Sequence, residues 1–215
     1  MMSYKTLRKI PGRYADVFPS KEKIASIFRS GRTYNCLHYA SYDGESDLVK
    51  SLTDAISWGG IGMDALQLDM TWPEAGDIAS VVHASQKTFE VILQVGKRAL
   101  KEADNDPQVV VNTLEDYEGI IKRVLLDRSM GKGIGMKADY LAPFVRAIKE
   151  RFPQFGISVA GGLGPETMHL VRPLVEEFPD ISIDAQGKLR QSGSILDPID
   201  WGIAEQYLIN ALSLF

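Results

Sequence analysis

The 215-residue sequence predicts an α/β fold built on a parallel sheet. Short β-branched or Leu-rich runs alternate with amphipathic segments along the chain. Runs as uniformly apolar as these are typical of strands buried on both faces. A helix between every two strands indicates parallel neighbours that are joined by crossovers.

Six strand–helix units follow one another from Thr33 to the C-terminus. The strands are expected over 33–41, 63–70, 89–96, 121–127, 156–162 and 181–185. The main helices are expected over 45–58, from Pro73 onward, and over 106–117, 139–152, 165–178 and 197–215. The first helix has one apolar face, formed by Leu48, Val49, Leu52, Ala55 and Ile56. Pro173 falls inside the penultimate helix and is expected to kink or split it.

Composition limits the class of protein. A hydrophobic share of 45% and a charged share of 24% are ordinary for one globular domain spanning residues 1–215. The net charge of −4 argues against a nucleic-acid partner, and no apolar run approaches the length of a membrane span. The single cysteine, Cys36, excludes an internal disulfide framework, and together with the lack of a signal-peptide pattern it favours the cytoplasm.

Polar residues or glycines stand at the end of most strands. They are Gln67 and Asp69, Gln94, Asp127, Gly161 and Gly162, and Asp184 and Gln186. A doubly wound sheet and a (β/α)8 barrel both explain the alternation of elements. In a barrel all these ends converge on one mouth, where barrel enzymes have their active sites. If the fold is a TIM (β/α)8-type barrel, these side chains therefore lie together in its pocket.

The stretch "ISVAGGLGPETM" (157–168) combines Gly161 and Gly162 with Gly164 at an N-cap position and Pro165 at the first helical position. Glycine lets the backbone approach a ligand closely, and helix N-termini attract anions. The alternative is a tight turn without a ligand. Gly187 and Lys188 are candidates for the other side of such a phosphate site, although Lys188 and Arg190 would also suit a solvated loop.

Four stretches resemble phosphoribosylanthranilate isomerase, the phosphate-binding (β/α)8 enzyme of tryptophan synthesis. They are "DALQLDMTWPEAGDI", "VLLDRSMGKGIGMKADYL", "ISVAGGLGPETM" and "ISIDAQGKLR" with the following "LDPIDW". The resemblance implies that the six strands are the third to eighth of a barrel and that the glycines form half of a phosphate cup. It also implies that Asp127 is a general acid and that the loop over 128–137 is a mobile lid. The cysteine base on the family's first strand has no counterpart in residues 1–18.

The resulting hypothesis is an isomerase of a small phosphorylated sugar or related metabolite that works by acid/base proton transfer. Asp127 would be the acid, and Asp69 or Cys36 the base. Cys36 and His38 point to the same side of one strand, although a buried cysteine is more often a small hydrophobe. One alternative is a metal-assisted lyase or aldolase with Mg²⁺ on Asp69, Asp127 and Asp184. The other is a non-catalytic barrel that binds a phosphorylated ligand.

The N-terminus is short for the expected barrel. Eighteen residues precede Pro19, too few for two βα units. Either "SYKTL" forms one short strand or the barrel is incomplete. An incomplete sheet would leave an open edge that invites a second subunit, so a homodimer is expected.

Overall fold

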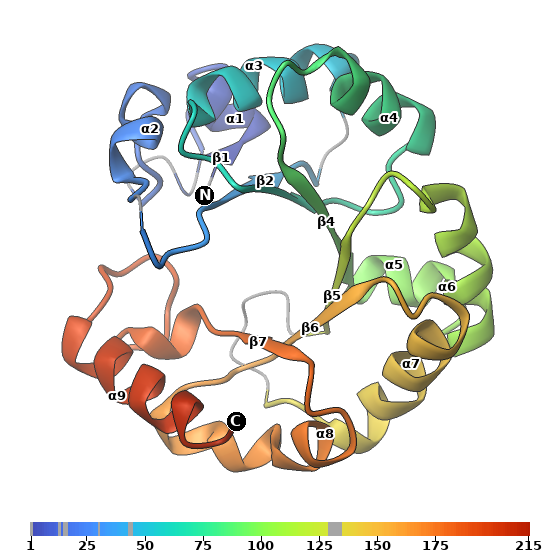
Figure 1. Cartoon of the computed structure of the whole chain (residues 1–215). Coiled ribbons are helices and arrows are strands. Elements are labelled where there is room, and N and C mark those ends of the chain that lie inside the picture. The colour runs from blue at the N-terminus through green and yellow to red at the C-terminus, as the bar shows by residue number, and fades with distance from the viewer. Residues whose placement is uncertain (1, 13, 15–16, 30, 43–44, 129–134) are drawn as a thin grey trace. The chain divides into compact units, whose positions relative to one another are not determined.

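The computed structural model describes residues 2–12, 14, 17–29, 31–42, 45–128 and 135–215. Within these residues, seven strands form one sheet in chain order (Figure 1). They are β1 (Met2–Ser3), β2 (Cys36–Ala40), β3 (Ala65–Asp69), β4 (Glu90–Gly96), β5 (Arg123–Asp127), β6 (Gly156–Ala160) and β7 (Ser182–Asp184). The pairs β1/β2, β2/β3, β3/β4 and β6/β7 are parallel. The predicted parallel α/β fold and its six strands are confirmed.

Helices follow the strands as the alternation predicts. The α-helices are α1 (Tyr4–Leu7), α2 (Ile24–Ile27), α3 (Leu48–Gly59), α4 (Ala75–Ala84), α5 (Lys97–Glu102), α6 (Pro107–Leu114), α7 (Ala138–Arg151), α8 (Arg172–Glu177) and α9 (Trp201–Leu212). The 3₁₀ segments are η1 (Lys21–Lys23), η2 (Glu115–Tyr117), η3 (Pro165–Leu170) and η4 (Gly187–Leu189). The predicted split at Pro173 is confirmed, because η3 ends before α8 begins and Pro173 lies in the first turn of α8.

The N-terminal strand differs from its prediction. The strand expected over "SYKTL" is confined to Met2 and Ser3, and Tyr4–Leu7 is helical instead. Ser3 is the N-cap of α1, since its hydroxyl accepts a hydrogen bond from the backbone N–H of Thr6 at 3.2 Å. The cap ends the extended backbone after two residues.

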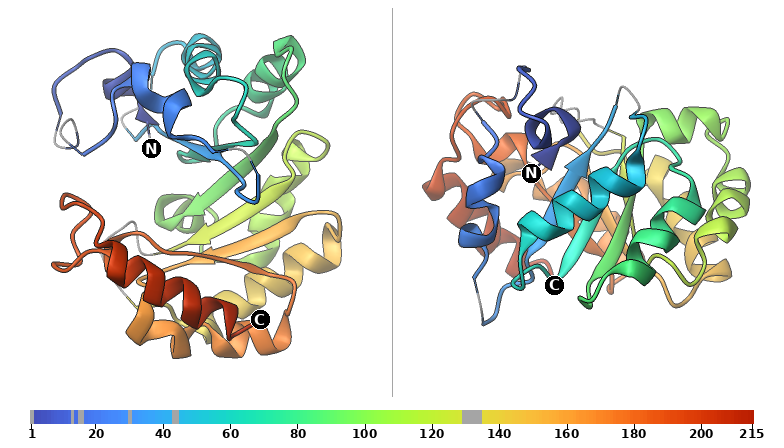
Figure 2. Two further views of the ribbon diagram at one scale, coloured as in Figure 1. Left: turned by 60° about the vertical axis from the view of Figure 1, so that its left-hand side comes forward. Right: turned by 90° about the horizontal axis from the view of Figure 1, so that it is seen from above.

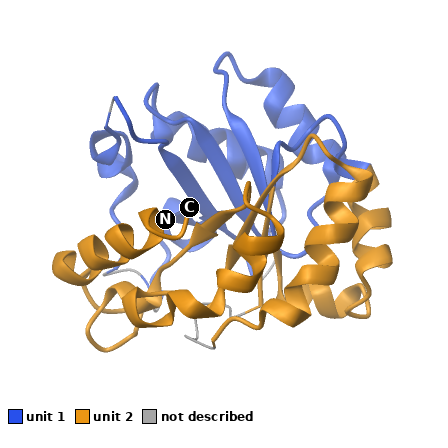
Figure 3. Cartoon of the chain, turned by 60° about the horizontal axis from the view of Figure 1, so that its bottom comes forward, with its two compact units in different colours: residues 1–94, 116–123 blue, residues 95–115, 124–215 orange. Residues whose placement is uncertain are grey.

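The chain divides into two compact units (Figure 3). Unit 1 comprises residues 1–94 and 116–123, and unit 2 comprises residues 95–115 and 124–215. In unit 1, Leu52, Ala55 and Ile56 of α3 are buried on the face that the sequence predicts. The Asp47 side chain caps this helix by accepting from the Lys50 N–H at 2.9 Å.

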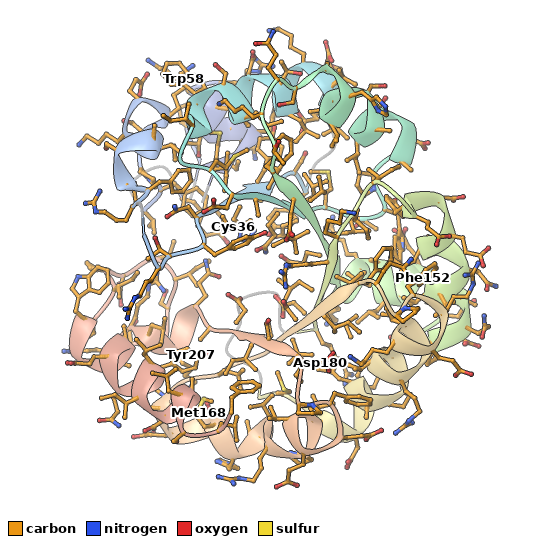
Figure 4. The ribbon with its side chains drawn as sticks, viewed as in Figure 1. Cys36, Trp58, Phe152, Met168, Asp180 and Tyr207 are labelled. Atoms are coloured by element: carbon orange, nitrogen blue, oxygen red, sulfur yellow. The ribbon has the colours of Figure 1, made fainter. Side chains whose placement is uncertain are left out.

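The core of unit 2 has aliphatic and aromatic parts. Ile157 and Val159 of β6 are buried on one face of the strand. Phe152, labelled in Figure 4, stacks on Phe155 with 4.8 Å between ring centroids. Helix α9 packs against η3 and η4, which follow β6 and β7 (Figure 2). The Asp200 side chain caps α9 by accepting from two backbone N–H groups. Across the described residues, every helix is too short or too polar to cross a membrane.

A charged cluster links strand ends in unit 1, away from the polar strand ends described below. Glu90, the first residue of β4, accepts hydrogen bonds from the Tyr34 hydroxyl at 2.5 Å and from Nε of Arg123 at 2.9 Å. The hydrogen bond from Tyr34 is the largest cause of the lowered pKa of Glu90. Burial, followed by the same hydrogen bond, raises the pKa of Tyr34 to about 12.

Glu90→Gln is expected to lower the free energy of unfolding by about 0.5–1 kcal/mol at pH 7, because the cluster is partly exposed. A carboxylate with a lowered pKa stabilises the fold above its unfolded pKa, and this stabilisation is lost as the pH falls through the folded pKa. Urea unfolding at pH 7 and pH 3 measures both quantities. The difference should be smaller at pH 3 than at pH 7, and the exposed Glu102→Gln serves as the control. An equal loss at both pH values would contradict an ionic contribution.

Candidate functional site

In unit 1, the register of β2 and β3 gathers polar side chains on one face. His38 lies opposite Gln67, and Ala40 lies opposite Asp69. Since side chains alternate along a strand, Cys36, His38 and Ala40 share a face, and Leu37 and Tyr39, buried at 1% and 0% exposure, take the other. The polar face of β2 therefore meets Gln67 and Asp69 of β3.

Asp69 is the most constrained member of this cluster. It ends β3 and is 8% exposed. Its Oδ2 lies 3.1 Å from Nε2 of His38 and also accepts a hydrogen bond from the Tyr42 hydroxyl. Among the described residues no donor reaches Oδ1. Asp69 thus has one oxygen held by two groups and one oxygen available to accept a proton.

Two glutamine side chains extend the cluster. Nε2 of Gln67 donates to Oε1 of Gln94 at 2.7 Å and lies 3.4 Å from Nδ1 of His38. Gln94 is 6% exposed and lies two residues before the end of β4, so it stands inside its strand and not at the end that the sequence indicates. The predicted residues Gln67, Asp69 and Gln94 therefore belong to one hydrogen-bonded network.

Cys36 has a different place. It is the first residue of β2, is half-buried, and lies opposite Ala65 (Figure 4). At about 3.3 Å per residue, it lies about 13 Å along the strand from the level of Asp69. The structure joins His38, and not Cys36, to Asp69. Catalysis by Cys36 stays a prediction.

Unit 2 contains the other predicted carboxylates. Asp127 ends β5 and is 8% exposed. The guanidinium of the next residue, Arg128, lies 4.2 Å from the ring centroid of Tyr140 in α7. Asp184 ends β7 opposite Ala160, and it is exposed. The predicted lid over 128–137 falls mainly on residues 129–134, which lie outside the described part of the chain.

The glycine loop after β6 has the backbone that its sequence indicates. Gly161 and Gly162 have φ values of +146° and +58°, in the region that favours glycine. The Thr167 hydroxyl donates to the Gly162 carbonyl at 2.8 Å. Because a trans peptide directs its C=O and N–H in opposite directions, the N–H of Leu163 points away from Thr167. The N–H of Leu163 is therefore directed to the side of the loop opposite the hydrogen bond between Thr167 and Gly162.

The loops after β6 and β7 approach closely, as the predicted phosphate cup requires. A Cβ atom placed on Gly164 would lie 2.6 Å from Cβ of Lys188 and 3.2 Å from its carbonyl oxygen. Gly187 is buried and Lys188 is exposed. Gly164 is the N-cap of η3, with Pro165 at the start, although the segment is a 3₁₀ helix of six residues. The close approach of the two loops is thus between Gly164 and Lys188. Gly161 and Gly162 precede Gly164 in the β6 loop, and Gln186 and Gly187 precede Lys188 in the β7 loop.

Two features, one in each unit, were not predicted. Tyr42 follows β2, and its contact with Asp69 has no signal in the sequence. In unit 2, the buried hydroxyl of Tyr207 in α9 has no hydrogen-bond partner within the described residues. Burial, followed by the charge of Asp184, raises the pKa of Tyr207. Figure 4 marks its position.

A metal site would require side chains in the described ranges that together could bind an ion. Over these residues, no group of three or more His, Cys, Asp or Glu side chains is arranged to hold an ion. The Mg²⁺ requirement of the lyase hypothesis stays a prediction.

Comparison with known proteins identifies the fold. The sequence matches no family model and no curated protein. A solved structure of phosphoribosyl anthranilate isomerase in complex with reduced 1-(o-carboxyphenylamino)-1-deoxyribulose 5-phosphate is similar to this chain, with a TM-score of 0.57 and 18% sequence identity. The match covers 91% of this chain and 81% of that chain. The chain therefore has an α/β fold of the TIM-barrel type, like that of phosphoribosylanthranilate isomerase.

Proposed function

We propose that this protein is a cytoplasmic isomerase that moves a proton within a small phosphorylated sugar or a related metabolite. The observation that supports it best is Asp69, a buried carboxylate with Oδ2 held by two groups and Oδ1 without a donor in the described chain. The structurally similar isomerase, crystallised with a ribulose 5-phosphate derivative, supports the class of substrate.

Asp69 has the role of general base. As the C–H bond next to the substrate carbonyl or imine breaks, Oδ1 forms an O–H bond with that proton. The electron pair of the C–H bond forms a carbon–carbon double bond, and the former C=O or C=N π pair moves to its heteroatom. That heteroatom takes a proton from a general acid, the role proposed for Asp127. The first proton then returns to the former carbonyl or imine carbon. The hydroxyl on the carbon that lost this proton gives its own proton back to the general acid and becomes the new carbonyl, which completes an isomerisation without an external oxidant.

The glycine loops of unit 2 have the role of phosphate site. Gly161 and Gly162 allow backbone N–H groups to approach an anion, and Lys188 supplies a positive charge beside Gly164. The phosphate is remote from the reacting carbon, and its binding energy would hold the sugar in place during proton transfer.

The first experiment is turnover in D₂O, followed by ¹H NMR. The panel contains aldopentose 5-phosphates, aldohexose 6-phosphates and, for the reverse direction, unreduced 1-(o-carboxyphenylamino)-1-deoxyribulose 5-phosphate, because the reduced compound has no carbonyl to isomerise. Each is incubated with and without Mg²⁺. We expect one substrate to isomerise and its product to carry deuterium at the former carbonyl or imine carbon, which receives the proton. Mg²⁺-dependent carbon–carbon cleavage would overturn this proposal in favour of the lyase, and binding without turnover would favour a non-catalytic barrel.

A further inference from the structure

The imidazole of His38 has a partner on each ring nitrogen. Its Nε2 lies 3.1 Å from Oδ2 of Asp69, and its Nδ1 lies 3.4 Å from Nε2 of Gln67. A carboxylate only accepts hydrogen bonds, and an amide nitrogen only donates them. The neutral ring that satisfies both partners has its proton on Nε2 and a lone pair on Nδ1.

Asp69 determines which groups donate and which accept in this network, because its carboxylate can only accept hydrogen bonds. Gln67 also donates from Nε2 to Oε1 of Gln94 at 2.7 Å, so both of its amide hydrogens have acceptors. In a neutral ring, turning both glutamine amides over would require the proton of His38 to move to Nδ1. The Nε2 lone pair would then face the carboxylate, which places two acceptors 3.1 Å apart. The pair Gln94 and Gln67 therefore acts with Asp69 to favour one tautomer.

We propose that His38 is a positioning residue for Asp69. Its Nε2 proton and the Tyr42 hydroxyl together hold Oδ2, so that Oδ1 is presented to the substrate in a fixed orientation. This inference rests on the role of Asp69 as the base in the proposed function. His38 itself exchanges no proton with the substrate, because both of its ring nitrogens are engaged.

Positioning has a kinetic signature. Without His38 the carboxylate retains its charge and chemistry but loses one of the two groups that orient it, which slows the proton transfer. Substrate affinity depends on other contacts. Loss of His38 should therefore lower kcat and leave KM nearly unchanged.

The test compares His38→Leu with His38→Gln in the full chain, with the substrate found in the D₂O experiment. Leucine removes the donor, and we expect a loss in kcat of about 10- to 100-fold with little change in KM. The glutamine amide can place an N–H near the position of Nε2 without a titratable ring, so His38→Gln should recover most of kcat. His83→Gln, at an exposed histidine of α4, is the control and should match the wild type.

The second measurement is the tautomer itself. Ring nitrogen correlations in the ¹⁵N-histidine-labelled protein at pH 8 distinguish an Nε2–H from an Nδ1–H ring, and the His38 signals are those missing from His38→Gln. We expect Nε2–H in the wild type. An active enzyme with an Nδ1–H tautomer, or with His38→Gln as impaired as His38→Leu, would overturn this inference alone. Failure of the wild type to turn over any phosphosugar would overturn the proposed function. The proposed role of His38 in positioning a catalytic Asp69 would then be overturned too.

Discussion

Asp69→Asn is expected to lower the rate of deuterium exchange into the substrate by 10²- to 10⁴-fold, the range that a general base contributes. The amide has nearly the same shape as the carboxylate, and its oxygen can still accept from His38 and Tyr42. It has no basic oxygen at the position of Oδ1. The expected result is therefore a protein that folds and binds its ligand but does not remove the proton. Exchange is measured by ¹H NMR in D₂O and folding by thermal unfolding.

The matched control is Asp77→Asn, a carboxylate in the first turn of α4 in the same unit. It removes the same charge from the chain and should leave exchange within about threefold of the wild type. If Asp69→Asn also stayed within that range, Asp69 would not be the base. The same assay on Cys36→Ser would then test the other base that the sequence predicts.

Hydrophobic patterning predicts the fold well because it acts over many residues. The six strands from β2 to β7 lie within their expected ranges, since each combines an apolar run with a helix on either side. The first strand was harder to place, because "SYKTL" contains no buried run. The length of this strand depends on one side chain: the Ser3 hydroxyl caps helix α1, so the extended backbone ends at Ser3.

The candidate site is predictable only in part. Parallel strands place their carboxyl ends at one edge, so the sequence indicates Asp69 and Asp127 without knowledge of contacts. The contact between His38 and Asp69 depends on register, which pairs Ala40 with Asp69. One signal in the sequence points to it, because Cys36 and His38 share one face of their strand and Gln67 and Asp69 share one face of theirs. Tyr42 reaches Asp69 from beyond its strand, where no periodicity applies.

The second large effect is expected on phosphate binding. The glycine loop after β6 allows it to be tested with two variants that differ in one negative charge. Gly162 has φ +58°, a conformation that asparagine and aspartate adopt more readily than other side chains. Gly162→Asn and Gly162→Asp therefore add side chains of nearly equal size and similar backbone cost. They differ by one negative charge beside the proposed phosphate site.

Ligand binding to the native state stabilises it by mass action, by about 2.7 kcal/mol when the ligand is at 100 times Kd. For a chain of this size that is a rise in melting temperature of roughly 5–10 °C. We expect this rise for the wild type with a sugar phosphate, a smaller one for Gly162→Asn, and none for Gly162→Asp. Thermal unfolding with the sugar phosphate, inorganic phosphate and the unphosphorylated sugar separates recognition of the phosphate from that of the sugar.

Comparison of the two variants decides between the two interpretations of the glycines. If both lose the stabilisation equally, the added side chain itself blocks the site, and charge is not the cause. If neither loses it, the loop after β6 is a turn without a ligand and the phosphate group binds elsewhere. Loss in Gly162→Asp alone requires an anion close to this backbone, because the two side chains differ only in charge and in one terminal group. That result would locate the phosphate in unit 2 independently of any measurement of turnover.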